Sequence, residues 1–277
     1  MTTLAEYAAS RELLGNLTQR ELRGKYKRSA LGWAWSLINP LALALIFTFV
    51  FGVVFKSRLE AVGNSELEGI AAYPLFLLVG LLPWAFLSNG ITGSIGALVA
   101  NANLVKKVYF PREILIGANV LSWVVSLLIE LMVLGVALLV FGNVWLQFLP
   151  VLAVVIALQT VFVTGIGLLL AILNVYFRDV QHFVGIGLQL WFYATPVIYP
   201  ITLLGNIADR EFLGVSLLTL YKLNPMTAFV EMYHQMLFYL QFPSWQLFVY
   251  AALVSFATLA LGLWVFNKLE PRLAEEL

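Results

Sequence analysis

Few of the 277 residues are of the types that carry out chemistry, and their spacing matches no catalytic or metal site. The chain contains no Cys, and its two histidines, His182 and His234, have no carboxylate or second His at a metal-ligand spacing. The pair Gly24-Lys25 lacks the upstream glycine and the following Ser or Thr of a phosphate-binding P-loop. Neither an H-E-x-x-H motif nor a complete G-x-G-x-x-G motif occurs. We therefore expect no enzymatic activity, no metal and no cofactor bound by this chain.

Glu130 is the only acidic residue inside an apolar stretch long enough to cross a membrane, the stretch 114–141. A carboxylate in a membrane is costly, so it needs a partner, a cavity or the interior of a helical bundle. It could line a transport path or take part in proton coupling. It could equally be a protonated side chain that is hydrogen-bonded to a neighbouring helix. Because no second charge lies inside an apolar stretch, Glu130 gives little support to an ion-coupled mechanism.

Aromatic residues make up 14% of the chain, and several gather near the ends of the apolar stretches. Trp and Tyr belts at the two membrane interfaces account for many of them. The alternative is that some line a path for sugars, whose C–H faces pack on aromatic rings while hydroxyls bond to Tyr and Trp edges. The residues proposed for such a substrate path, with Glu130, are Trp84, Trp191, Phe192, Tyr193 and Tyr199.

The composition requires a membrane protein. Hydrophobic residues make up 61% of the chain, charged residues only 11%, and the mean hydropathy is +0.91. A soluble domain has about 25% charged residues, so too little polar surface is present to cover a core in water. The net charge of +1 gives no reason to expect nucleic acid as a partner.

Apolar stretches free of charged residues predict an all-α integral membrane protein with six transmembrane helices. A helix needs about 20 apolar residues to cross a bilayer, and the uncharged stretch 131–177 is divided by the turn signal Gly142-Asn143. The expected spans are 34–55, 72–98, 114–141, 149–174, 181–199 and 245–266. They form one transmembrane domain, 34–266, preceded by a cytoplasmic interface segment, 1–33, and followed by a cytoplasmic tail, 267–277.

The segment 207–240 is apolar, but charged residues and Pro225 interrupt it. It is therefore expected to be re-entrant or interfacial rather than a seventh span. Twelve of the sixteen Lys and Arg residues fall on the side of the N-terminus in this arrangement. Because basic residues stay cytoplasmic, both termini are expected in the cytoplasm. Residues 1–33 lack the apolar core of a cleavable signal peptide.

Two connections on the cytoplasmic side suggest a docking surface for a cytoplasmic partner. The first, 101–113, interleaves apolar and basic residues and ends with Pro111 at the start of the next helix. Its lysines could serve only as topology signals, but a plain loop does not need the apolar residues. The second, 174–182, carries adjacent opposite charges. The expected contacts are Val105, Lys106, Lys107, Val108, Tyr109, Phe110, Arg112, Arg178 and Asp179.

The motifs taken together resemble the membrane subunits of type-2 ATP-binding-cassette exporters, particularly those for polysaccharides, O-antigen and teichoic acid. The resemblance extends along nearly the whole chain in the family's order. The segments that carry it are Lys25-Tyr26-Lys27-Arg28-Ser29-Ala30-Leu31-Gly32-Trp33 with Asn39-Pro40, Lys106-Lys107-Val108-Tyr109-Phe110-Pro111-Arg112-Glu113, Tyr176-Phe177-Arg178-Asp179, Thr195-Pro196-Val197-Ile198-Tyr199-Pro200 and Leu223-Asn224-Pro225-Met226-Thr227. One departure is His234, where an arginine is expected after such a Met-Tyr pair.

The resemblance implies a homodimer of this subunit in the bacterial cytoplasmic (inner) membrane, paired with two copies of a cytoplasmic ATPase that binds ATP and Mg. Segment 104–112 would be a coupling helix on the ATPase, and 176–180 a second contact. Residues 3–20 would lie along the inner leaflet, and 207–240 would form short re-entrant helices near the outer leaflet. The transported substrate would be a lipid-linked polysaccharide, such as O-antigen, a galactan or a teichoic-acid-like polymer.

Three other functions compete with this interpretation. An exporter of drugs or lipids would share the same architecture, and only the short outer loops and the high aromatic content favour sugar. An ion-coupled secondary transporter would require internal repeats and broken helices with paired polar sites, and no convincing repeat is present. A membrane-embedded transferase would need paired acids or a nucleophile with its base, which the sequence lacks.

Overall fold

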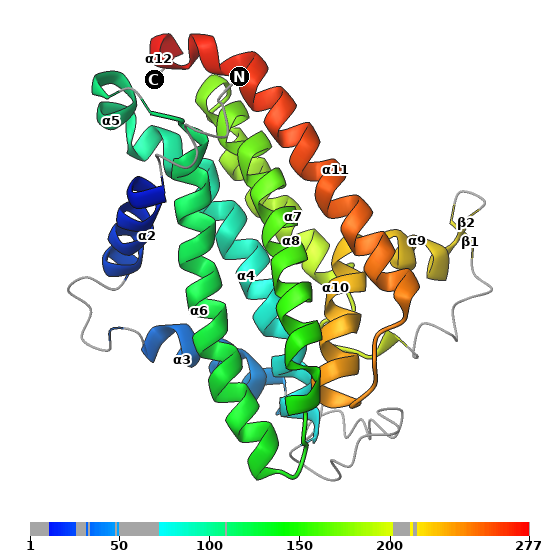
Figure 1. Cartoon of the computed structure of the whole chain (residues 1–277). Helices are drawn as coiled ribbons and strands as arrows, with labels where there is room; N and C mark the ends of the chain where they lie inside the picture. Colours follow the sequence, from blue (N-terminus) through cyan, green and yellow to red (C-terminus); the bar gives the residue numbers. More distant parts are fainter. Residues whose placement is uncertain are drawn as a thin grey trace.

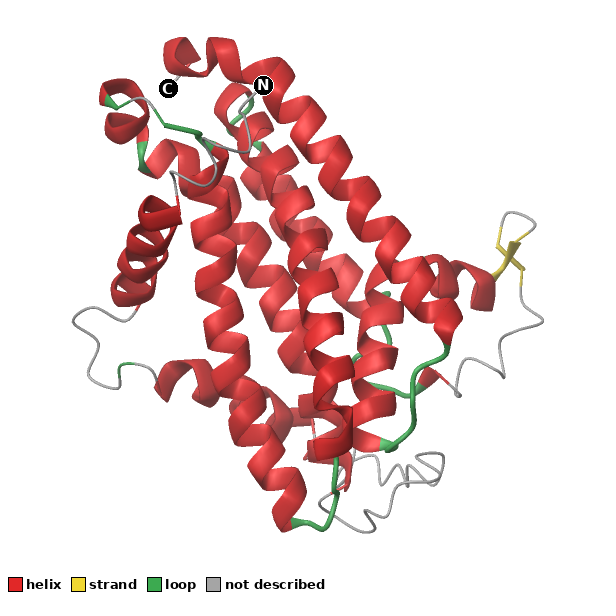
Figure 2. Ribbon diagram, viewed as in Figure 1, coloured by secondary structure: helices red, strands yellow, loops and turns green. Residues whose placement is uncertain are grey.

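The computed structural model describes residues 11–25, 32, 34–47, 49, 72–108, 110–201, 211–212 and 215–276, and almost all regular structure in them is helical (Figures 1 and 2). The helices are α2 (Arg11–Lys25), α3 (Ala34–Phe47), α4 (Ala72–Ala100), α5 (Ala102–Lys107), α6 (Glu113–Val140), η2 (Leu146–Phe148), α7 (Leu149–Tyr176), α8 (Val180–Tyr193), α9 (Leu217–Leu223), α10 (Pro225–Tyr233), η4 (His234–Phe238), α11 (Trp245–Leu269), η5 (Glu270–Arg272) and α12 (Leu273–Glu276). Two short strands, β1 (Glu211–Phe212) and β2 (Val215–Ser216), pair antiparallel.

Four helical segments within the described residues are long and apolar enough to cross a membrane. They are Tyr73–Ala100, Glu113–Val140, Leu146–Tyr176 and Trp245–Arg272. Each has at least 28 residues, which corresponds to about 40 Å of helix, more than a hydrocarbon core of about 30 Å. The sequence predictions at 72–98, 114–141, 149–174 and 245–266 coincide with them. The turn between the second and third contains Gly142 with a φ of +88°, which explains why glycine ends the run there.

Within the described residues, the other two predicted spans contain shorter helices. For 34–55, α3 covers Ala34–Phe47, and 48 and 50–55 lie outside the described residues. For 181–199, α8 has 14 residues, about 21 Å of helix, and the chain then turns through 194–199. Pro196 accounts for this end, because the residue before a proline is disfavoured in helical conformation. A count of six spans therefore stays a prediction.

Helix α4 lies at the centre of the bundle and packs against α6, α7, α8, α10 and η4 (Figure 1). In its most apolar stretch 72% of the residues are buried, compared with 17% in α11. Four side chains from neighbouring elements reach carbonyl oxygens along α4. The pairs are His234 Nε2 to Phe76 (3.0 Å), Gln159 to Pro83 (2.8 Å), Asn119 to Gly90 (3.0 Å) and Asn174 to Ile95 (3.1 Å).

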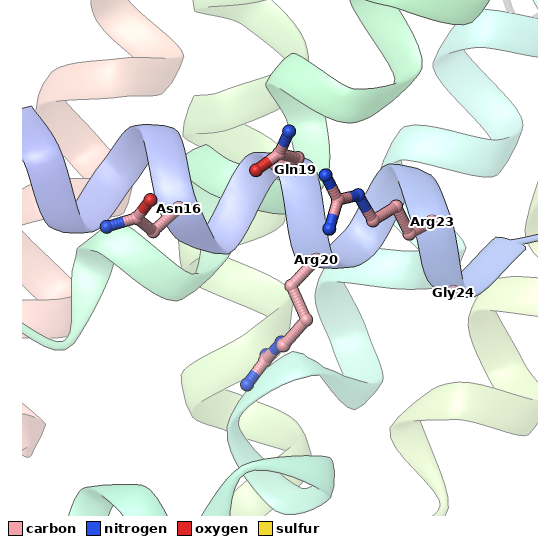
Figure 3. A pocket seen from close by; sticks show the side chains of 5 residues that line it. All are labelled: Asn16, Gln19, Arg20, Arg23 and Gly24. Atoms are coloured by element: carbon pink, nitrogen blue, oxygen red, sulfur yellow. The ribbon is translucent and has the colours of Figure 1, made fainter.

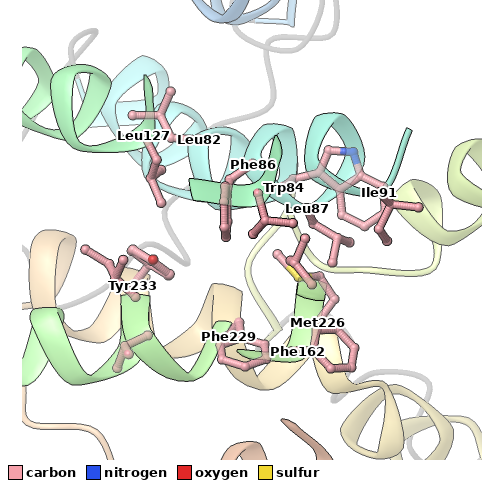
Figure 4. Packing of buried hydrophobic residues seen from close by; sticks show 14 of the residues in the cluster. Leu82, Trp84, Phe86, Leu87, Ile91, Leu127, Phe162, Met226, Phe229 and Tyr233 are labelled. Carbon is pink, nitrogen blue, oxygen red and sulfur yellow. The ribbon is translucent and has the colours of Figure 1, made fainter. Parts of the chain in front are cut away.

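Aromatic and aliphatic side chains fill the space between α4, α7 and α10. Figure 4 shows Leu82 and Phe86 of α4 across from Phe229 and Tyr233 of α10. Phe162 of α7 lies beside Phe229, with ring centroids 5.7 Å apart. All these side chains are buried. The short helix α10 is thus part of the core, although its nine residues are too few to cross a membrane.

Helices α7 and α11 approach each other until their backbones touch. A Cβ atom placed on Gly262 would lie 2.3 Å from the carbonyl oxygen of Gly165. A Cβ placed on Gly165 would lie 2.5 Å from the backbone nitrogen of Leu259. Small residues at such crossings allow the close van der Waals packing that holds membrane helices together. This contact fixes α11, whose other faces are largely exposed.

We predict that Gly262→Ala destabilises the pairing of α7 and α11, because its methyl group would overlap the Gly165 carbonyl. The expected loss is about 1–3 kcal/mol, as for other overpacked sites. Thermal unfolding of the purified protein in detergent measures it as a lower midpoint. Gly96→Ala is the matched control, because nothing lies within 4 Å of a Cβ there and alanine favours a helix. A Gly262→Ala midpoint equal to that of wild type would contradict the proposed contact.

Candidate functional site

The first of the two connections that the sequence places in the cytoplasm consists of the short helix α5 and the segment leading into α6. Val105 (3% exposed) and Phe110 are buried in the chain's own core, whereas Lys106, Lys107 and Val108 (51% exposed) face outward. The predicted apolar contact surface is therefore divided. Val105 and Phe110 anchor the connection to the bundle, and the outward face consists of the other three residues. Tyr109 lies outside the described residues.

The side chain of Asn101 holds α5 at the end of α4. Its amide nitrogen donates to the Ala97 carbonyl (2.8 Å), and its amide oxygen accepts from Arg20 of α2 (2.7 Å). Its backbone carbonyl accepts from the backbone nitrogens of Leu104 and Val105, which starts α5. A polar residue in this position thus ends one helix, begins the next and attaches α2 to both.

The second connection joins α7 to α8 through three exposed residues, Phe177, Arg178 and Asp179. The sequence predicted Arg178 and Asp179 as partner contacts but did not include Phe177, which is 67% exposed. The sequence did contain a signal for Phe177, because it is an aromatic residue in a short charged loop between two helices. The backbone is extended at Phe177 and turns helical again at Asp179, whose carbonyl accepts from the Phe183 nitrogen.

Both connections lie at the end of the bundle that also holds η5 and α12 (Figure 1). Arg112 donates to the Glu270 carbonyl (2.9 Å), and its Nε lies 4.0 Å from the Glu270 carboxylate. The hydroxyl of Tyr176, the last residue of α7, donates to the Leu269 carbonyl (2.9 Å). Arg112 was predicted to contact a partner, but its side chain is hydrogen-bonded to another residue of the same chain. Lys106, Lys107 and Arg178 leave positive charge on the outer surface of this end.

Helix α2 runs along the N-terminal half of α6 (Figure 1), with Leu14 against Gly117 and Lys25 against Ser126. Residues 3–20 were expected along the inner leaflet, and 3–10 of these lie outside the described residues. The exposed side of α2 borders a groove of about 460 Å³ (Figure 3). Its lining residues are Asn16, Gln19, Arg20, Arg23 and Gly24.

Glu130 is buried in α6 beside the end of α2. The ammonium group of Lys25 lies 3.3 Å from the centre of the Trp123 ring and donates to the Ser126 hydroxyl (3.1 Å). Glu130 follows Ser126 by four residues and so lies on the same face of α6. Burial lowers the pKa of Lys25, and the nearby charge of Glu130 acts in the opposite direction. The buried carboxylate therefore has a cation of another helix close by, and its role in a substrate path stays a prediction.

Four of the aromatic residues predicted for the substrate path come together. Trp84 of α4 contacts Trp191 edge to face, with centroids 6.0 Å apart, and Phe192 at 5.4 Å. Phe192 in turn contacts Tyr193 at 5.2 Å. Trp84 is buried and Tyr193 is 56% exposed, so the cluster extends from the core to the surface. The hydroxyl of Tyr199 lies 3.1 Å from both the Tyr193 carbonyl oxygen and the Tyr221 hydroxyl, which brings the fifth residue to the same region.

Asn224 fixes this aromatic cluster, and the sequence did not predict that role. Its Oδ1 accepts from Trp191 Nε1 (2.7 Å) and from the Met226 nitrogen (3.0 Å), so it also caps α10. Its amide nitrogen donates to the Ala194 carbonyl and the Thr195 hydroxyl, both at 3.0 Å. The pair Asn224-Pro225 is typical of a helix start, but the three other bonds come from a distant segment.

Among the described residues, no three His, Asp or Glu side chains gather as a metal site requires.

His234 is the residue that departs from the expected arginine. Its ring stacks on Phe76 with centroids 4.0 Å apart and an angle of 4° between the planes. Gly80 leaves room for it, because a Cβ there would lie 3.1 Å from His234 Cε1. The side chain is 2% exposed. It is therefore a core residue that holds η4 against α4.

We predict that Asn224→Ala lowers the stability of this end of the protein. It removes a helix cap and leaves the Trp191 N–H without its acceptor, which costs about 1–3 kcal/mol. Thermal unfolding in detergent measures the change. Asn103→Ala, at an exposed position in α5, is the matched control and is expected to leave the midpoint within about 1 °C of wild type, as surface substitutions usually do. Equal midpoints for the two variants would refute this role for Asn224.

Comparison with known proteins agrees with the helical membrane architecture. The ABC-2 type transporter family matches residues 12–238. The chain is 31% identical over 268 residues to the O-antigen export system permease protein RfbA of Klebsiella pneumoniae, which covers 95% of this chain and 94% of that protein. It is 32% identical over 272 residues to RfbA of Myxococcus xanthus, covering 96% of each. The polysialic acid transport protein KpsM of Escherichia coli is 25% identical over 191 residues, 66% of this chain and 67% of that protein. The chain therefore belongs to the ABC-2 type transporter family.

Proposed function

We propose that this chain is the channel-forming membrane subunit of an ATP-driven exporter that moves a lipid-linked polysaccharide across the bacterial cytoplasmic membrane. The observation that carries the proposal is similarity over almost the full length to proteins named O-antigen export permeases. The shorter match to a polysialic acid transport protein supports a polysaccharide rather than a small molecule. The polymer would be an O-antigen, a galactan or a teichoic-acid-like chain.

In the proposed assembly, two copies of the chain face each other and two cytoplasmic ATPase chains hold the ATP and Mg. Each copy would have six spans within 34–266, a cytoplasmic interface segment 1–33 and a cytoplasmic tail 267–277. Short helices within 207–240 would be re-entrant at the outer side. Four long apolar helices and the one-sided distribution of Lys and Arg support this topology.

The ATPase would dock on the outward residues of the two cytoplasmic connections. In the first these are Lys106, Lys107 and Val108, and in the second the residues from Phe177 to Asp179. Support comes from their exposure at one end of the bundle, while Val105 and Phe110 anchor the same segment from inside. A docking segment that is rooted in the core can transmit a displacement, whereas a free loop would absorb it. Rigid-body motion driven by ATP binding and hydrolysis would then open the channel between the two copies.

The polysaccharide would pass the aromatic cluster of Trp84, Trp191, Phe192, Tyr193 and Tyr199. Sugar rings present flat C–H faces that pack on aromatic rings, and their hydroxyls can bond to Tyr hydroxyls. The exposed ring of Tyr193 and the paired hydroxyls of Tyr199 and Tyr221 support this assignment. An exporter of drugs or lipids would use the same machinery with a different path.

We predict that Val108→Asp abolishes productive contact with the ATPase, because an unpaired carboxylate would be buried against the partner. Stimulation of ATP hydrolysis by this chain should fall about tenfold or more. The measurement is ATP turnover of the cognate ATPase in liposomes, together with its copurification. Val144→Asp is the matched control, because Val144 is similarly exposed (58%) in the connection between α6 and η2, away from α5. Phe110→Ala is a poorer test, since Phe110 is buried and its loss would also affect folding.

If neither wild-type protein nor the control variant binds or stimulates any ATPase, the proposed function is wrong. Retained stimulation by Val108→Asp would instead remove only the docking assignment.

We predict that Tyr193→Ala reduces polysaccharide export severalfold, whereas Tyr193→Phe leaves it nearly unchanged, because the ring face supplies the contact. Surface glycan on cells whose export depends on this chain measures the effect, with an antibody against the glycan as probe. Loss of efflux of a hydrophobic dye in Tyr193→Ala, with glycan display intact, would favour the drug or lipid exporter instead.

A further inference from the structure

The cytoplasmic end of α11 accepts two hydrogen bonds from segments that are far apart in the sequence. Tyr176 donates to the Leu269 carbonyl, and Arg112 donates to the carbonyl of the next residue, Glu270 (both 2.9 Å). The Glu270 carbonyl also accepts from the backbone nitrogen of Leu273, so the bond from Arg112 is an additional one that ties this end to another part of the chain. The two side-chain donors lie at the bases of the two cytoplasmic connections.

Each donor is placed where it can hold its connection. Arg112 directly precedes α6 and closes the segment that follows α5. Tyr176 is the last residue of α7 and directly precedes the exposed Phe177. Beyond Glu270, the tail continues as η5 and α12, and α12 contacts both α5 and α7 (Figure 1). Leu273 of α12 is fully buried. Two hydrogen bonds and one apolar contact thus attach the tail to both connections.

We propose that the end of α11, with η5 and α12, is a positioning element that makes the two cytoplasmic connections move as one body. Tyr176, Arg112 and Leu273 are its positioning residues. This inference rests on the proposed function, since it concerns how a displacement imposed by the ATPase reaches the membrane. It assigns a function to the tail 267–277, which the sequence marked only as cytoplasmic.

The contact between α7 and α11 extends the effect into the membrane. Because the backbones of the two helices touch at Gly165 and Gly262, no flexible side chain lies between them at that level. A push on either connection is therefore delivered to the α7–α11 pair as a unit. Without the tail, each connection would move only the helices that it joins.

Tyr176→Phe tests the element with the smallest change, because it removes one hydroxyl and keeps the ring. The chain should still copurify with the ATPase, and its stimulation of ATP turnover in liposomes should fall about three- to tenfold, the effect of one lost hydrogen bond. The matched control is Tyr250→Phe. The Tyr250 hydroxyl donates to the Leu223 carbonyl at the opposite end of α11, and its loss should leave stimulation within about twofold of wild type. Leu273→Ala should act like Tyr176→Phe.

A covalent link between the tail and the first connection shows whether stimulation is lost because coupling is lost or because the fold is less stable. The chain contains no Cys, so Arg112→Cys with Glu270→Cys introduces a single reactive pair. Stimulation should be low in the reduced protein and return toward wild type when a short bifunctional thiol reagent joins the pair. If linking instead stops turnover, the joint must open during the cycle and the inference is wrong.

The remaining outcomes test the positioning element and the proposed function separately. Wild-type protein that stimulates ATP turnover, with Tyr176→Phe equal to Tyr250→Phe, would refute the positioning element and leave the proposed function intact. Wild-type protein that neither binds nor stimulates an ATPase would refute both.

Discussion

Hydrogen bonds to the backbone of α4 are the interaction on which the rest of the structure depends. In a membrane, apolar side chains gain nothing from leaving lipid for protein, so directed polar contacts and close packing decide which helices pair. Carbonyl oxygens at Phe76, Pro83, Gly90 and Ile95 accept hydrogen bonds from η4, α7, α6 and α7 in turn. The donors His234, Gln159, Asn119 and Asn174 would each be costly as unpaired groups. Each therefore holds its own element at one level of the central helix.

The two candidate regions, the docking connections and the aromatic cluster, are both attached to α4. At the C-terminal end of α4, Asn101 connects directly to α5, which leads to the outward residues Lys106, Lys107 and Val108. Nearer its other end, Trp84 provides the buried base of the aromatic cluster, and Asn224 holds the Trp191 side of it. A displacement of α4 would thus reach both regions. The C-terminal end of α11 makes a second attachment at the same end of the bundle, through Arg112 and Tyr176.

Hydropathy located the four long helices, because a run of apolar residues is a local property that needs no knowledge of neighbours. The same signal overestimated the length of α8, where Pro196 ends the helix inside the predicted span. It also could not tell that Val105 and Phe110 point inward, since the six-residue helix that holds Val105 is too short to show a periodic face and Phe110 lies in the irregular segment after it. The sequence could not show that Lys25 lies near Glu130, because the two residues are 105 positions apart in the chain. The sequence named Asn224 only as part of a family motif, and its bonds to Trp191, Ala194 and Thr195 depend on how two segments meet.

The bare contact between Gly165 and Gly262 has a consequence for the order in which the protein is made. A ribosome adds about 5–20 residues per second, so the glycine of α11 is synthesised about 5–20 seconds after that of α7. During this interval the face of α7 around Gly165 lacks the helix that packs against it in the folded chain. The pairing of α11 with α7, and of the tail with the two connections, can therefore form only after all the other described helices have been synthesised. A nascent chain that stops before α11 therefore lacks the backbone contact between Gly165 and Gly262.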